Sequence, residues 1–189
     1  PSNESLSASL KHFQALIKNK SRLPEVNLNP GGYIKFIEQI IRVNNVSLRE
    51  IETLVRHIEI YVTLQSGGDL RSEQDYTYSV IALCAIAIFV LEPELAQTIR
   101  RKSLDAKSLA KFMGVDNLPS RDEIGYSDVY QKVFCALACD AMYNRDLYIP
   151  SGEEEMREFK AFWTSDLQAP LNGTYLTICE NAITALSLE

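Results

Sequence analysis

The chain has 189 residues, a net charge of −6 and an apolar content of 46%. This length is enough to bury a core and predicts one domain or two closely joined halves. The acidic balance argues against a protein that wraps nucleic acid or coats an anionic membrane, because such proteins usually carry a dense basic patch. The one basic run is short, at Arg100, Arg101 and Lys102.

The first part of the chain is predicted to form two amphipathic helices with a loop between them. We expect a helix over residues 7–18 and a second helix from Tyr33, because apolar residues recur in both at intervals of three and four. Residues 21–32 hold two prolines and a Gly-Gly pair, which are typical of a loop. The apolar positions are Leu10, Phe13, Leu16 and Ile17 in the first helix, and Tyr33, Phe36, Ile37, Ile40 and Ile41 in the second.

Residues 46–51 carry a full set of helix-start signals. Ser47 can cap the helix, Glu50 completes a capping box, and Val46 with Ile51 matches a hydrophobic staple. The helix is expected to end before the glycine pair at residues 67–68. Its predicted inward stripe is Ile51, Leu54, Val55, Ile58, Tyr61 and Val62.

The stretch "DYTYSVIALCAIAIFVLEPEL" is apolar all round in its middle, from Val80 to Leu91. About a dozen residues are too few for a membrane span, which needs roughly 20. We therefore expect no membrane span and predict a central buried helix over residues 78–91. Pro93 then fits the first turn of a new helix, with Leu95 and Ile99 facing inward.

Asp105 is positioned to cap a short helix that ends at Gly114. The polar stretch of residues 115–125 follows and divides the chain. We predict a first, helical region over residues 1–114 and a C-terminal helical extension over residues 115–189, packed on it. Three helices are expected in the extension, starting near Ser127, Ser151 and Gly173. Their inward positions include Val129, Val133, Phe134, Leu137 and Met142 in the first, and Leu176, Ile178, Ile183 and Leu186 in the last.

The four cysteines are predicted to be core residues rather than a metal or redox pair. Cys84, Cys135, Cys139 and Cys179 all lie inside apolar helical patterns, and no CxxC or HxxxH spacing adds further ligands. Without a signal peptide, a reducing, cytoplasmic location is expected. The opening Pro1 and the closing Leu-Glu pair indicate a fragment of a longer polypeptide.

No complete catalytic or phosphate-binding motif occurs in the sequence. GxxxxGK[ST], GxGxxG, GxSxG and Glu-x-x-His patterns are all missing, and "GGYIK" at residues 31–35 lacks the length and ending of a phosphate loop. His57 is predicted to be solvated beside Arg56, and acidic runs such as Glu153–Glu155 to be solvated faces. We therefore predict no catalytic residue, no metal site and no cofactor held by this chain alone.

Arg49 is less easily explained. It occupies the second helical position, near the positive end of the helix dipole, where a cation costs a few tenths of a kcal/mol. One interpretation is a solvated charge stripe of Arg49, Glu52, Arg56 and Glu59, in which Glu52 pairs with both arginines. The other interpretation is that Arg49 faces an anionic ligand.

The segments "VSLREIETLVRHIEIYVTLQSGG" and "VIALCAIAIFVLEPELAQTIRRKSL" resemble the C-terminal helical part of the KAP family of P-loop NTPases. Members of that family have a similar SLREIER helix, an apolar helix and an EPEL or DPEL turn into the next helix. The resemblance covers residues 30–112. Where the family often has arginine after the second glutamate, this chain has Thr53.

The resemblance implies a helical lid that follows a nucleotide-binding α/β core. That core would lie upstream of Pro1, carry the Walker A and Walker B motifs, and bind ATP and Mg²⁺. In related ATPases an arginine at the start of a lid helix contacts the γ-phosphate and senses its hydrolysis, and Arg49 matches that position. The implied partner is therefore the upstream nucleotide-binding domain of the same polypeptide.

We thus expect an all-α, multi-helix bundle around a central buried helix. Its expected function is that of a non-catalytic lid and interaction region of a larger KAP-like NTPase, coupling nucleotide state to the downstream helices. The alternative is a freestanding all-α adaptor or oligomerisation module that binds protein partners or itself. The adaptor predicts an exposed apolar patch of several hundred Å² or a self-complementary dimer face. Nucleic acid is not expected as a partner.

Overall fold

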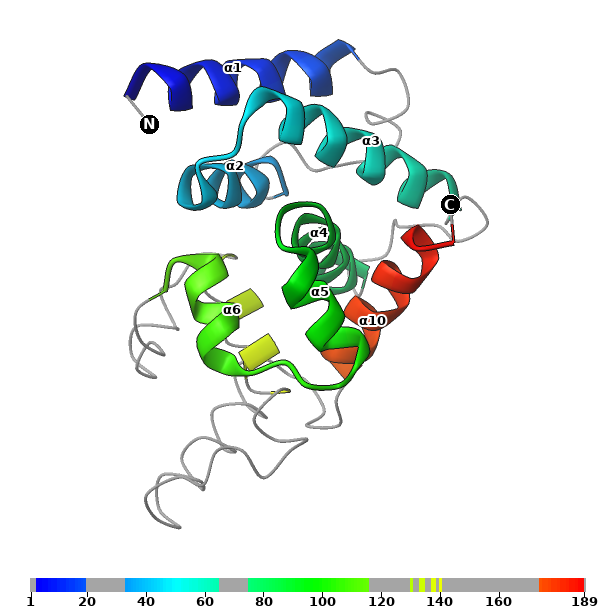
Figure 1. Cartoon of the computed structure of the whole chain (residues 1–189). Helices are drawn as coiled ribbons and strands as arrows, with labels where there is room; N and C mark the ends of the chain where they lie inside the picture. Colours follow the sequence, from blue (N-terminus) through cyan, green and yellow to red (C-terminus); the bar gives the residue numbers. More distant parts are fainter. Residues whose placement is uncertain are drawn as a thin grey trace.

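The structure, a computed structural model, describes residues 3–19, 33–64, 75–115 and 174–188, together with residues 130, 133, 134, 137, 138 and 140. Seven helices lie in these ranges (Figure 1), and the described residues contain no strand. The helices are α1 (Asn3–Asn19), α2 (Tyr33–Asn44), α3 (Leu48–Leu64), α4 (Asp75–Leu91), α5 (Pro93–Arg100), α6 (Ala106–Met113) and α10 (Thr174–Leu186). The predicted all-α bundle is confirmed.

Helix α4 is the centre of the bundle, as predicted. Every residue from 80 to 88 is buried, and α4 packs against α2, α3, α5 and α10 (Figure 1). A helix that is apolar on all sides has no face suited to water, so it is stable only when other helices surround it. Composition alone therefore fixes the place of α4 in the fold.

Helices α1 and α2 lie on one side of α4. All five predicted core positions of α2 are buried, from Tyr33 to Ile41. Helix α1 begins at Asn3, earlier than the predicted start at Ser7. Its Phe13 is 1% exposed, whereas the other predicted positions of α1 are only partly buried. Helix α1 packs on α2 and α3, and the Ser9 hydroxyl donates a hydrogen bond to the Val46 carbonyl at 2.9 Å.

Helix α3 buries five of its six predicted stripe positions, from Ile51 to Tyr61, while Val62 is partly buried at the edge of the core. Helix α5 starts with Pro93 at its first position, and Leu95 and Ile99 are buried, as predicted.

Helix α6 has the predicted caps at both ends. The Asp105 carboxylate accepts hydrogen bonds from the Ser108 N–H at 2.8 Å and from the Ser108 hydroxyl at 2.7 Å. The hydroxyl contact is the main cause that lowers the pKa of Asp105. Gly114 closes the helix at φ +62°, where a Cβ would lie 2.6 Å from Cγ1 of Val43. Glycine is thus needed here for both its backbone conformation and its small size.

The last helix joins the same core. Helix α10 begins at Thr174, one residue after the predicted start near Gly173, and packs against α4, α5 and α3. Its N-terminus is capped by Asp140, which is fully buried and accepts hydrogen bonds from the N–H groups of Tyr175 at 2.7 Å and Leu176 at 3.1 Å. Burial, and then the negative charge of Asp140, raise the pKa of Tyr175.

Only part of what was predicted for the extension falls on described residues. Val133, Phe134 and Leu137 are helical and buried, which agrees with the helix expected from Ser127. Val129, Met142, residues 116–125 and the helix near Ser151 lie outside the described residues. The boundary between residues 1–114 and 115–189 stays a prediction. None of the described helices has both the length and the apolar character that crossing a membrane requires.

Candidate functional site

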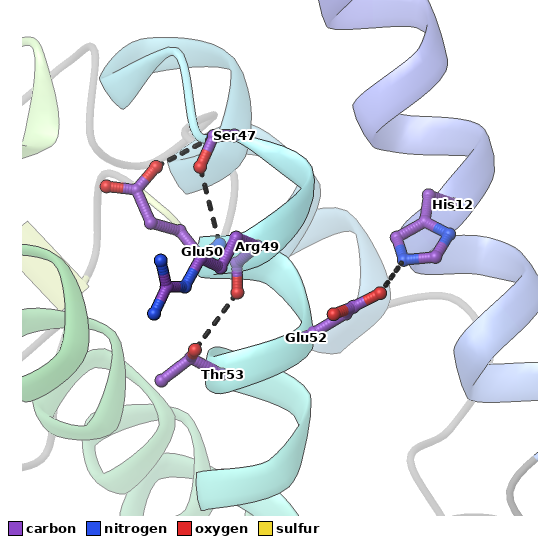
Figure 2. A network of polar contacts seen from close by, with 6 residues as sticks. All are labelled: His12, Ser47, Arg49, Glu50, Glu52 and Thr53. Carbon is purple, nitrogen blue, oxygen red and sulfur yellow. Dashed lines mark hydrogen bonds and ion pairs between the residues drawn. The ribbon is translucent and has the colours of Figure 1, made fainter.

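The start of α3 is held by a complete capping box (Figure 2). The Ser47 N–H donates to the Glu50 carboxylate at 2.8 Å, and the Glu50 N–H donates to the Ser47 hydroxyl at 3.3 Å. Val46 and Ile51, the two staple residues, are 3% and 0% exposed. The backbone that carries Arg49 is therefore fixed on both sides.

Replacing Ser47 with alanine is expected to lower the free energy of unfolding by about 1 kcal/mol, because the Glu50 N–H loses its side-chain acceptor. Urea unfolding measures the change. Ser47→Asp is the matched control, since aspartate also caps helices well and should leave stability nearly unchanged. An equal loss in both variants would contradict a capping role.

Arg49 is exposed, and no ion pair or hydrogen bond joins its guanidinium to any residue that the structure describes. Its contact is through the backbone, where the Arg49 carbonyl accepts a hydrogen bond from the Thr53 hydroxyl at 3.0 Å. In Figure 2 the guanidinium points away from the side of α3 that carries Glu52. The predicted pair between Arg49 and Glu52 is not formed.

Glu52 pairs instead with a residue far away in the sequence. The Nε2 atom of His12 on α1 lies 3.1 Å from the Glu52 carboxylate. Helix α1 packs across α3, which brings these two side chains together. The predicted pair of Glu52 with Arg56 was therefore also wrong. Spacing along α3 cannot show that a side chain on another helix, here His12, binds Glu52 instead.

His57 was predicted to be solvated, and this was wrong. The side chain is partly buried, with Nδ1 2.7 Å from the Thr53 carbonyl and its ring centroid 5.6 Å from that of Phe89 on α4. A carbonyl can only accept, so Nδ1 is the protonated nitrogen. His57 thus packs between α3 and α4, because α4 covers the flank of α3 on which it lies.

Cys84 and Cys179 are free and fully buried, which confirms the core prediction for these two; Cys135 and Cys139 lie outside the described residues. Burial raises the pKa of the Cys84 thiol to about 12 and that of Cys179 well above its usual value. A thiol that stays protonated at neutral pH is a poor nucleophile and a poor metal ligand. Within the part of the chain that the structure describes, no group of three or more histidine, cysteine and acidic residues is arranged to hold a metal ion.

Comparison of the chain with protein-family models, curated proteins and solved structures finds no match. A guanidinium offers five N–H donors in a planar fork that fits a phosphate or carboxylate. Glu50, the nearest carboxylate in sequence, already accepts the Ser47 N–H. The start of α3 is thus suited to binding an anion.

Proposed function

We propose that this chain is a non-catalytic helical lid and interaction region of a larger KAP-like P-loop NTPase. In this proposal Arg49 contacts the γ-phosphate of ATP that is bound, with Mg²⁺, by a nucleotide-binding domain of the same polypeptide. The observation that supports it is an exposed guanidinium, without an ion pair to a described residue, on the capped start of α3.

The position of Arg49 favours an external anion. A cation in the first turn of a helix is repelled by the dipole, and the cost is a few tenths of a kcal/mol. An anion that binds at the same turn is attracted by the dipole and by the guanidinium together. Because the capping box already fixes the backbone, only the Arg49 side chain has to be ordered when the anion binds.

The packing of the bundle offers a route by which nucleotide state reaches the rest of the chain. Helix α3 packs against α4, and α4 packs against α10. Densely packed helices move as bodies rather than deforming locally. A shift of α3 on ATP hydrolysis would therefore move α4 and α10. Contacts that a partner protein makes with the extension would change as a result.

The adaptor alternative gains less support. The large apolar side chains that are exposed among the described residues are Leu48, Leu64 and Leu188. Leu48 and Leu64 mark the two ends of α3, roughly 24 Å apart at 1.5 Å per residue. Leu48 and Leu64 are thus too far apart to belong to one small apolar patch.

The test uses the polypeptide that contains both the nucleotide-binding domain and this chain. Arg49→Ala is expected to lower ATP hydrolysis by about 10- to 100-fold, because a charge-assisted hydrogen bond to the transferred phosphate is lost. Arg49→Lys should retain part of the rate. Arg56→Ala is the control, since Arg56 is also exposed on the same helix and should leave the rate unchanged.

Two results would contradict the proposal. One is an equal loss of hydrolysis in the Arg49 and Arg56 variants. The other is ATP hydrolysis by the 189-residue chain alone, because the phosphate loop and the Mg²⁺ ligands belong to the nucleotide-binding domain. Urea unfolding of the isolated Arg49→Ala chain should show no loss of stability, which separates a ligand contact from a structural role.

A further inference from the structure

The turn that joins α5 to α6 is strongly basic, in a chain whose net charge is −6. Between residues 97 and 115 the sequence has five cations and one acidic residue, Asp105. All five cations are exposed. We name this set the α5–α6 basic patch; it consists of Arg100, Arg101, Lys102, Lys107 and Lys111.

Asp105 offsets only one of the five positive charges of the patch. Its carboxylate is engaged with the N–H and hydroxyl groups of Ser108 as the cap of α6. No ion pair joins any of the five cations to a described acidic residue. The charges therefore act together on whatever approaches this surface.

The backbone holds the first three cations in place. The N–H of Arg101 donates to the Gln97 carbonyl at 3.0 Å, and the N–H of Lys102 donates to the Ile99 carbonyl at 2.9 Å. Lys102 has φ +53°, in the left-handed region that side chains other than glycine seldom adopt. A lysine is thus kept where glycine would be more stable.

Helix stability accounts for only part of the patch. The dipole favours Arg100 and Lys111, which lie in the last turns of α5 and α6. It disfavours Lys107, which lies in the first turn of α6. Lys107 and Lys111 are four residues apart on one helix, so they also repel each other. Lys102 costs stability through its left-handed backbone, and Lys107 costs stability through its charge. A negatively charged partner would offset the cost at Lys107.

We infer that the α5–α6 basic patch docks an acidic polypeptide segment of a partner protein. Nucleic acid fits less well, because the rest of the chain is acidic and the one aromatic side chain between residues 97 and 115, Phe112, is buried and cannot stack on bases. A membrane also fits less well, since Leu104 and Leu109 are buried rather than available for insertion. Helix α6 is about 12 Å long at 1.5 Å per residue, a length that a short segment can cover.

The experiment measures binding of a fluorescent Glu-rich peptide to the 189-residue chain at low salt. The variant Lys102→Gly with Lys107→Glu should bind at least about tenfold more weakly, because two positive charges are removed from the patch and one negative charge is added. The same variant should melt about 2 to 5 °C higher, because it relieves the left-handed lysine and gives the first turn of α6 an acidic residue. If the variant is more stable and yet binds the peptide more weakly, the loss of binding cannot be caused by unfolding.

The matched control is Lys11→Glu with Lys18→Gln on α1, where both lysines are exposed and the change in net charge is the same. The control should bind the peptide as the parent chain does. The inference is overturned if the parent chain does not bind the peptide, or if the control loses binding equally. Tighter binding to a single-stranded oligothymidine or to phosphatidylserine vesicles than to the peptide would also overturn it.

Discussion

Replacing Ile86 with alanine is expected to lower the free energy of unfolding by about 2 to 5 kcal/mol. Ile86 is 0% exposed in the middle of α4, and α4 packs against α2, α3, α5 and α10. Because helices surround the site on several sides, the cavity left by the lost atoms cannot close by the movement of one neighbour. Urea unfolding monitored by circular dichroism measures the loss.

Ile86→Val is the control, and it should cost only about 0.5 to 1.5 kcal/mol, because one methylene group is removed. Leu16→Ala provides a second comparison, since Leu16 is only partly buried on the peripheral helix α1. If Ile86→Ala costs no more than Leu16→Ala, α4 is not the centre of the core.

The protein is expected to lose stability steeply above pH 9, and Cys84 is a main cause. Its thiol has a pKa of about 12 in the folded chain against a usual value of 9.0. Between these values the unfolded chain releases the proton and the folded chain keeps it, so unfolding becomes more favourable as pH rises. The stabilisation is complete below pH 9 and falls by about 1.4 kcal/mol per pH unit for this thiol. Cys179 and Tyr175, whose pKa values are also raised, act in the same direction.

The measurement compares the parent chain with Cys84→Ala in urea at several values between about pH 8 and pH 11. The variant should show a shallower fall of stability with pH above pH 9, by up to about 1.4 kcal/mol per unit, whatever its stability at the lowest pH. Identical slopes would mean that the Cys84 thiol ionises in the folded chain as readily as in the unfolded one.

Local signals in the sequence were sufficient for much of the fold. The capping box of Ser47 and Glu50, the cap at Asp105 and the glycine stop at Gly114 all involve residues a few positions apart. Their geometry follows from neighbours along the chain, so a short pattern predicts it well. Helix α4 was recognisable for another reason, because its composition leaves it no exposed face.

Contacts between distant elements could not be read in this way. The cap of α10 comes from Asp140, which lies 35 positions before Tyr175. No sequence pattern near Thr174 indicates that Asp140 is the capping residue. The pairing of His12 with Glu52 and the packing of His57 against Phe89 depend on which helices meet. Sequence spacing within one helix carries no information about contacts between different helices.

Arg49 could be predicted only in part from the sequence. Its place in the first turn of α3 follows from the local capping signals, and its exposure is a property of the folded bundle. That Arg49 binds an anion held by a further domain stays a proposal.

The most direct test of the proposed lid is the affinity for ATP and for ADP of a polypeptide that contains the proposed nucleotide-binding domain and this chain, with and without Arg49→Ala. If Arg49 contacts the γ-phosphate, the substitution should weaken ATP binding by about 10- to 100-fold and leave ADP binding unchanged, because ADP has no γ-phosphate. Equal effects on the two nucleotides, or no effect on either, would contradict the account.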